Sequence, residues 1–345
     1  MRKTIFILLL VLLVPQGSYA LEPLPDSVFV RVIDIGQALC AVVVMPDNRY
    51  MIYDAGSPSA MKQIRSLIPE YSEIDLLVIS HNDADHLRGV AQICSEYRVK
   101  RVLRTGRTPE TVAARRADDA LNAQIESGDC IDFNFSRNDI EILPGSTWNF
   151  GGAFVTIIFG LANAPDEWID AYNLNVSEQN NIVSICVRVQ YAGKSILFTG
   201  DTVGRKIGDE SDVCIGAERA MVDWSHVINI ESDVLIGQHH GADNASSLEF
   251  IREVNPQYVV FSAGHNSSYR HPRASTAMRF IDGLQLAPEQ IFRTDFGDDE
   301  GEDEWDYGRI PGHRDPRDDD HVDILITSDG RLFVEYENPL NNSVN

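Results

Sequence analysis

The hydrophobic positions along the chain predict a β-rich protein with helices on its outside. Short apolar runs that alternate with polar residues and end at turn residues indicate strands. Strands are expected at Val28–Ile35, Ala41–Met45, Arg49–Asp54, Ile74–Ser80, Arg101–Leu103, Phe154–Phe159, Ile182–Gln190, Ser195–Thr199, Asp233–Ile236, Tyr258–Phe261 and Asp323–Thr327. Helices are expected at Met61–Ile68, Leu87–Glu96 and near Pro109–Ser127. This order is typical of an α/β sandwich, in which functional residues gather where strands end.

Residues 1–20 have the pattern of a secretory signal peptide. Basic residues follow Met1, Ile5–Val14 is an unbroken apolar run of ten residues, and the small residues Ser18 and Ala20 precede a cut after Ala20. This run is short for a membrane span, and an uncleaved anchor is the alternative. No later segment is apolar enough to cross a membrane. We therefore expect a soluble protein that is exported to the periplasm or the extracellular space.

Residues 21–345 are expected to form one domain, because no Gly/Ser or Pro-rich linker divides them. An acidic insertion is expected near 295–323, where Asp295–Asp323 holds thirteen Asp or Glu against three Arg. The segment lacks D-x-D-x-D-G spacing, which favours a solvated loop over a calcium site. The formal charge of the whole chain is −23. Surfaces that bind a nucleic-acid backbone are basic. This charge therefore argues against a nucleic-acid-binding surface that covers the whole protein.

The five cysteines show no C-x-x-C spacing. An oxidising compartment would permit one disulfide among them. Because Cys40, Cys94 and Cys186 lie in apolar runs, we expect these three to be buried thiols instead.

The densest group of candidate metal ligands is Ser80–Val90, S-H-N-D-A-D-H-L-R-G-V, directly after an expected buried strand. In an extended turn, residues two apart point the same way. His81 and Asp83 are therefore expected to serve one metal, and the offset pair Asp85 and His86 another. Imidazole and carboxylate without thiolate suit Zn²⁺ or Mn²⁺ in a hydrolytic site. The alternative is a polar loop in which Asp85 only caps a following helix.

The motif H-x-D-x-D-H at residues 81–86 resembles the metallo-β-lactamase superfamily, whose usual form is H-x-H-x-D-H. Its third position, Asp83, is similar to the branch that holds the soluble domain of the DNA-uptake protein ComEC and the bacterial phosphorylcholine esterases. Further similar motifs follow in the family's order: V-I-D-I-G-Q-A-L-C at Val32–Cys40, I-Y-D-A-G at Ile52–Gly56, L-F-T-G-D at Leu197–Asp201, G-Q-H-H-G at Gly237–Gly241 and N-S-S-Y-R-H-P at residues 266–272. The resemblance implies a four-layer αββα sandwich with two divalent metal ions, Zn²⁺ or alternatively Mn²⁺.

The same resemblance implies further metal ligands and their supports. Asp201 would be the carboxylate that bridges both metals, because one oxygen for each cation is what a bridge requires. One of His239 and His240 would complete the second site, and the sequence does not say which. Asp54 and Asn181 would support the ligands through hydrogen bonds. For Asp54, a turn residue without such contacts is the alternative.

Asp85 and His271 are the residues expected to take part in the reaction itself. His271 matches the H-P motif of the ComEC branch. With a near-neutral pKa it would bind a phosphate oxygen or protonate the leaving group, and a loop histidine without a role is the alternative. Three other histidines are expected at the surface, namely His226, His313 and His321, while His265 has no assigned place.

The chain departs from the family in one respect. No His occurs between His86 and Asp201, where many members have another ligand. The two Asn residues at 180–181 are similar to those that the ComEC branch has between the H-x-D-x-D-H motif and the bridging Asp. The first metal would keep only His81, Asp83 and Asp201 from the protein, which leaves positions for water or substrate and makes Mn²⁺ plausible beside Zn²⁺.

These residues predict an exported binuclear metal-dependent hydrolase of phosphodiesters or phosphate esters, in which a metal-bridging hydroxide attacks phosphorus. The substrate would be a small or polymeric phosphate ester, and nucleic acid stays open as a substrate despite the acidic composition. One alternative is a β-lactam or other amide or ester hydrolase of the same fold. The other is a non-catalytic binding domain that the metal only stabilises.

Overall fold

The structure is a computed structural model of the chain, and it describes residues 20–137, 139–208, 213–264, 269–295 and 320–337. The expected signal peptide up to residue 19, most of the expected acidic insertion, and the histidines His265 and His313 lie outside these ranges. No helix within them has both the length and the apolarity needed to cross a membrane.

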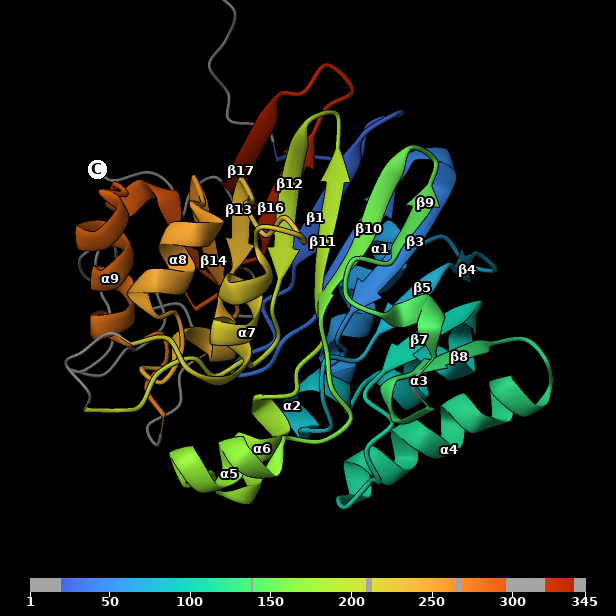
Figure 1. Ribbon diagram of the computed structural model, residues 1–345. Helices are drawn as coiled ribbons and strands as arrows, with labels where there is room; N and C mark the ends of the chain where they lie inside the picture. The colour runs from blue at the N-terminus through green and yellow to red at the C-terminus, as the bar shows by residue number, and fades with distance from the viewer. Residues whose placement is uncertain (1–19, 138, 209–212, 265–268, 296–319, 338–345) are drawn as a thin grey trace, which may run out of the picture.

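Two large mixed sheets form the centre of the molecule (Figure 1). The first has the strand order β17-β16-β1-β2-β3-β5-β7-β8, and the second the order β15-β14-β13-β12-β11-β10-β9. The first sheet contains β1 Val28–Val32, β2 Ala41–Met45, β3 Arg49–Tyr53, β5 Leu76–Val78, β7 Arg101–Arg104, β8 Ile131–Asn134, β16 Val322–Ile326 and β17 Leu332–Tyr336. The second contains β9 Thr147–Phe150, β10 Ala153–Phe159, β11 Cys186–Tyr191, β12 Lys194–Phe198, β13 Val234–Ile236, β14 Tyr258–Phe261 and β15 Ile291–Arg293. A small parallel pair joins β4 Glu73–Ile74 to β6 Arg98–Val99.

Helices cover the outer face of each sheet and complete four layers (Figure 1). The first sheet packs against α1 Met61–Leu67, α3 Val90–Glu96 and α4 Val112–Glu126. The second packs against α7 Gly216–Trp224, α8 Leu248–Val254 and α9 Ala274–Leu284. Three short helices, α2 Ala84–Leu87, α5 Asp166–Tyr172 and α6 Val176–Asn181, lie beyond one edge of the sheets. The predicted αββα sandwich is confirmed.

Strand β2 shows why the central strands are apolar throughout. Val43 and Met45 contribute to the core between the sheets, whereas Val42 packs into the cluster under the first sheet's helices. Both faces of the strand are therefore buried, and the alternation of a half-exposed strand is lost.

Several expected elements differ from the structure in their bounds. The expected helix Leu87–Glu96 is two helices, α2 and α3, because the chain at Gly89 passes close to the loop after β3. The Gly89 N–H donates to the Ala55 carbonyl at 2.6 Å, and a Cβ at Gly89 would lie 2.9 Å from the Ser57 carbonyl oxygen. The expected strand Ile182–Gln190 begins only at Cys186, because α6 occupies the residues just before Ile182.

The expectation that His321 lies at the surface is wrong. The residue immediately precedes β16, which pairs with both β1 and β17, and it is only 2% exposed. Its Nδ1 accepts a hydrogen bond from the Asp34 backbone N–H at 2.9 Å. The acidic run before His321 suggested a solvated segment, but a partner almost three hundred positions earlier in the chain buries its end. His226 is exposed, as expected.

All five cysteines are unpaired. Cys40 and Cys186 are buried as expected, and Cys94 is half-buried. Burial raises the pKa of each of these thiols, that of Cys94 to about 12. The sandwich is thus held together by apolar packing without a disulfide.

Candidate metal centre

The candidate ligands gather at the carboxyl ends of parallel strands from both sheets. Strands β3 and β5 run parallel, and His81 and the helix α2 follow the end of β5. In the other sheet, β12 and β13 run parallel, and Asp201 and the His239–His240 pair follow their ends. Because parallel strands direct their carboxyl ends to one edge, ligands that are far apart in sequence meet there.

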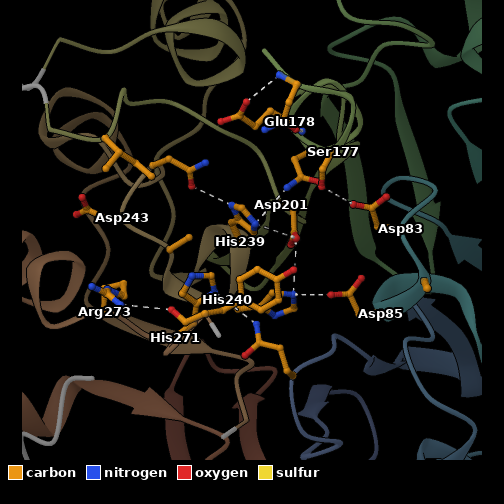
Figure 2. A pocket seen from close by; sticks show the side chains of 18 residues that line it. Asp83, Asp85, Ser177, Glu178, Asp201, His239, His240, Asp243, His271 and Arg273 are labelled. Carbon is orange, nitrogen blue, oxygen red and sulfur yellow. Dashed lines mark hydrogen bonds and ion pairs between the residues drawn. The ribbon is translucent and has the colours of Figure 1, made fainter. Parts of the chain in front are cut away.

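Asp201 lies at the centre of this group (Figure 2). Its Oδ1 is 3.1 Å from His86 Nε2, while its Oδ2 is 3.6 Å from His240 Nε2 and 4.0 Å from His81 Nε2. His240 Nε2 is also 3.7 Å from Asp85 Oδ2. Two sets of potential ligand atoms lie close enough together to hold a cation: His81, His86 and Asp201, and Asp85, His86 and His240.

Three atoms at this centre are buried without a hydrogen-bond partner among the described residues. They are His86 Nε2, Asp201 Oδ1 and His240 Nε2; the first two lie 3.1 Å apart, but they attract each other only when the His86 ring is protonated. Burying polar atoms without partners is costly, and such atoms need a reason to persist. Nitrogen and carboxylate lone pairs that converge in this way fit a divalent cation such as Zn²⁺ or Mn²⁺.

Hydrogen bonds behind the imidazoles set the direction in which they point. His86 Nδ1 lies 2.7 Å from Asp54 Oδ2, and Asp54 also accepts the Ser80 N–H and hydroxyl at 2.7 Å each. His240 Nδ1 donates to the Ser262 carbonyl oxygen at 2.6 Å. With Nδ1 engaged, both rings present Nε2 to the centre, which is the usual arrangement behind metal-binding histidines.

The structure distinguishes His240 from His239, which the sequence does not. His239 Nδ1 lies 2.9 Å from Asn244 Oδ1, and its Nε2 lies 3.1 Å from the Asn181 amide. The amide orientation that satisfies both neighbours has Asn181 accepting from His239 and donating to Asp83 Oδ2 at 3.1 Å. Both nitrogens of His239 are therefore engaged, whereas His240 offers a free Nε2.

Asp83 is outside both sets of three ligand atoms, but it lies beside His81, as the expected pairing of these two residues requires. Its Oδ2 is 3.7 Å from His81 Nε2, and its Oδ1 accepts a hydrogen bond from Asn180 Nδ2 at 2.6 Å. Helix α2 starts at Ala84, so Asp83 is the extended N-cap residue, while the residues after it follow helical geometry. His86 also lies beside His81, with ring centroids 4.2 Å apart.

Two glycines allow the ligand loops to approach one another. A Cβ at Gly56 would lie 1.8 Å from the Asp85 carbonyl oxygen, and one at Gly200 would lie 2.7 Å from Ser80 Cβ. The residue with a left-handed φ in this segment is Asp54, at 58°, and not Gly56. Gly56 is needed instead for close contact with the loop that carries Asp85.

The ionisable groups at the centre shift one another's pKa values. Burial lowers the pKa of His86, but the carboxylates of Asp201 and Asp54 outweigh burial and hold that pKa well above its ordinary value. Burial raises the pKa of Asp201, but His86 and His240 outweigh it and hold the pKa well below its ordinary value. The pKa of Asp85 is likewise lowered, because His240 and His86 outweigh its burial. Both carboxylates are therefore ionised at neutral pH, as ligands for a cation must be.

A cavity of about 660 Å³ opens over this centre (Figure 2). Its wall includes four aspartates, Asp83, Asp85, Asp201 and Asp243. On another side, His271 and Arg273 line it, and Gln37 Nε2 lies 3.4 Å from His271 Nδ1. Burial and the neighbouring His239 and His240 depress the pKa of His271 to about 3, below the near-neutral value expected. At neutral pH its imidazole is thus an uncharged hydrogen-bond donor and does not carry an additional proton.

Some residues at the site had no assigned role in the sequence. Gln37 stands within the motif Val32–Cys40, and Arg273 follows the H-P motif by one residue, so motif position alone could have suggested both. Ser262 had no such signal, because its carbonyl reaches His240 only through the packing of the loop after β14.

Comparisons with known proteins show the family. The profile of the beta-lactamase superfamily domain matches residues 49–277. The competence protein ComA of Neisseria gonorrhoeae is 27% identical over 272 residues, which are 76% of this chain and 31% of ComA. The ComE operon protein 3 of Bacillus subtilis is 25% identical over 65% of this chain and 24% of its own length. The chain therefore spans about a third or less of these relatives.

Solved structures of similar fold include the metallo-beta-lactamase fold protein YhfI from Bacillus subtilis, with a TM-score of 0.45 and 12% identity over 78% of this chain and 97% of YhfI. Zn²⁺-bound PqqB from Methylobacterium extorquens has a TM-score of 0.44 and 13% identity over 77% of this chain and 97% of PqqB.

The family match and the curated relatives confirm the predicted assignment: the chain belongs to the metallo-β-lactamase superfamily, a superfamily of hydrolases, and to its ComEC-like branch.

Proposed function

We propose that the protein is a hydrolase that uses a pair of divalent cations to cleave phosphodiesters or phosphate esters. The observation that carries this proposal is the convergence of His86 Nε2, Asp201 Oδ1 and His240 Nε2, all buried and without hydrogen-bond partners among the described residues. A site that served only as a polar pocket would satisfy these atoms within the protein.

Asp201 Oδ1 lies 3.1 Å from His86 Nε2 and its Oδ2 lies 4.0 Å from His81 Nε2, which suits a carboxylate shared by two cations. His86 offers one free nitrogen and serves a single cation. The first cation would be held by His81, Asp83 and Asp201, and the second by Asp85, His86, His240 and Asp201. Asp83 is included because it is 3.7 Å from His81 and lines the cavity.

The charges around the cavity support an anionic substrate only when cations are present. The four aspartates of the wall would repel a phosphate, and divalent cations bound among them would reverse that field, polarise a phosphate oxygen and lower the pKa of a water molecule. Arg273 and the uncharged imidazole of His271 line the same cavity and are placed to donate hydrogen bonds to the remaining phosphate oxygens. Asp85, ionised at neutral pH, is placed to orient the attacking water.

The proposal includes export, supported by the pattern of residues 1–20. N-terminal sequencing of the protein recovered outside the cytoplasm tests it. A first residue of Leu21 is the expected result. Protein retained in the cytoplasm with its first twenty residues intact would contradict export and leave the proposed chemistry standing.

The chemistry is tested with purified full-length protein, stripped of metal and then supplied with Zn²⁺ or Mn²⁺. The substrates are bis-p-nitrophenyl phosphate, p-nitrophenyl phosphate, nitrocefin and DNA, the last because one relative is named a competence protein. We expect metal-dependent turnover of the phosphate esters and no turnover of nitrocefin. We expect Asp201→Asn to abolish the turnover of the phosphate esters.

Two results would replace the proposal. Turnover of nitrocefin alone would assign the site to amide or ester hydrolysis. An Asp201→Asn protein that keeps its biological effect, together with no turnover by the unmodified protein, would assign a non-catalytic binding role.

A further inference from the structure

A second buried carboxylate, Glu218, lies behind the candidate metal centre and outside both sets of ligand atoms. It belongs to α7 and is 0% exposed. Its Oε1 accepts hydrogen bonds from the Ser246 N–H at 2.6 Å and from Gln238 Nε2 at 3.1 Å, and its Oε2 accepts one from the Ser247 N–H at 2.8 Å. Both oxygens therefore bind donors that belong to one loop, residues 237–247.

This loop carries His239 and His240 in an unusual backbone conformation. The φ angles of His239, His240 and Ser246 are 48°, 55° and 57°, in the left-handed region that non-glycine residues rarely occupy. Such residues persist only where surrounding structure holds them in place. Gln238 directly precedes the histidine pair, and its Oε1 accepts a further hydrogen bond from the Ser246 hydroxyl at 2.8 Å. Glu218 thus links Gln238, near the start of the loop, to Ser246 and Ser247 at its end.

Glu218 also packs against the loop that carries Asp201. A Cβ at Gly204 would lie 1.8 Å from Glu218 Cδ, so only glycine allows the carboxylate to lie there. Gly204 follows Asp201 by three residues, and its N–H donates to the Asn244 carbonyl at 3.1 Å. One side chain therefore contacts both loops whose ligands, Asp201 and His240, meet at the centre.

We infer that Glu218 is a positioning residue, which holds the His240 loop against the Asp201 loop so that both ligands face the same cation. This inference rests on the proposed function. It predicts that Glu218 acts on metal affinity beyond any contribution it makes to stability, because the direction of the His240 imidazole depends on the backbone that Glu218 anchors.

The test compares Glu218→Gln, Glu218→Asp and the control Glu249→Gln in the full chain. Gln keeps the size of the side chain but replaces one acceptor oxygen with a donor, which would face an N–H group. Asp keeps both acceptors but is shorter by one methylene. Glu249 on α8 pairs with Arg219 on α7, so it links these two helices at the surface without touching the loop. Mn²⁺ alone is titrated into metal-free protein and followed by electron paramagnetic resonance, and the melting of the metal-free protein is measured separately.

We expect Glu218→Gln to weaken the binding of one Mn²⁺ by roughly tenfold or more, Glu218→Asp to recover part of that affinity, and Glu249→Gln to bind both ions as the unmodified protein does. If one Glu218 variant fails to fold, the other decides. Unchanged affinity in a folded Glu218→Gln protein, whatever its melting temperature, would overturn the inference, and so would loss of folded structure in both variants. If the unmodified protein binds neither Mn²⁺ nor, in a parallel calorimetric titration, Zn²⁺, the proposed function itself is refuted.

Discussion

Oδ2 of Asp54 lies 2.7 Å from Nδ1 of His86, and both side chains are fully buried. The carboxylate fixes the ring so that Nε2 points toward Asp201. We expect Asp54→Asn to lower metal affinity by about 10-fold to 100-fold, because the amide no longer holds the same tautomer and orientation. Competition with a chromophoric chelator measures this change. Asp75→Asn is the control, since Asp75 is an equally buried carboxylate that accepts the Tyr50 N–H and lies outside the cavity wall. Equal losses of affinity in the two variants would show that the effect is not specific to the His86 contact.

The two adjacent histidines provide a matched pair of substitutions. His240→Asn removes a free Nε2 at the centre, so we expect it to lose one bound cation and most activity. His239→Asn changes a ring whose nitrogens are held by Asn244 and Asn181, so we expect both cations to remain, with a smaller loss of activity. Metal content by atomic spectroscopy and turnover of bis-p-nitrophenyl phosphate measure both effects. The reverse pattern would assign the ligand to His239.

Metal removal is expected to lower the melting temperature, because a cation that binds only the folded protein stabilises it. At a free concentration one hundred times the dissociation constant, this stabilisation is about 2.7 kcal/mol. Asp201→Asn should reduce the rise in melting temperature that the metal causes. Asp243→Asn should keep it, since Asp243 lines the same cavity but is held by Arg205 and Arg279. The idea fails if both variants respond to Zn²⁺ like the unmodified protein.

The buried imidazole of His321 predicts a loss of stability in acid. Burial first, and then the charges of Arg31 and Lys62, depress its pKa to about 3 from an ordinary 6.5. Between these values the unfolded chain binds a proton that the folded protein does not. The contribution of His321 is therefore complete above pH 6.5 and falls by up to about 1.4 kcal/mol per pH unit as the pH decreases toward the folded pKa.

Urea unfolding of the unmodified protein and of His321→Gln across pH 7 to pH 4 measures this contribution. The difference in unfolding free energy between the two should shrink as the solution becomes more acidic. His226→Gln is the control, because His226 is an exposed histidine. A constant difference for His321→Gln would show that its imidazole titrates alike in both states.

Five free thiols are expected in protein purified without reductant. A thiol reagent should react with all five after denaturation, and in the native state should react slowly, beginning with the half-buried Cys94. A count of three in denatured protein would reveal a disulfide.

Much of the fold was predictable because the central strands carry their own signal. The expected strands Ala41–Met45 and Tyr258–Phe261 agree with the structure to the residue, since both are apolar runs bounded by turns. The short strands β9 and β17 were missed, and they are partly exposed with mixed side chains. Helices α7, α8 and α9 were missed as well, because charged or small residues interrupt the apolar positions that each helix packs against the second sheet.

The sequence by itself determined which kinds of candidate ligand the protein carries and that they follow buried strands, because residue type and local hydrophobic pattern are properties of short segments. Only the tertiary structure decided that His240 rather than His239 offers a free nitrogen, that Asp83 lies beside the two sets of ligand atoms, that His321 is buried and that Glu218 joins two loops. Each of these depends on hydrogen bonds between residues distant in sequence. Such partners are set by how the sheets and loops pack, so they cannot be predicted from the local pattern of residues.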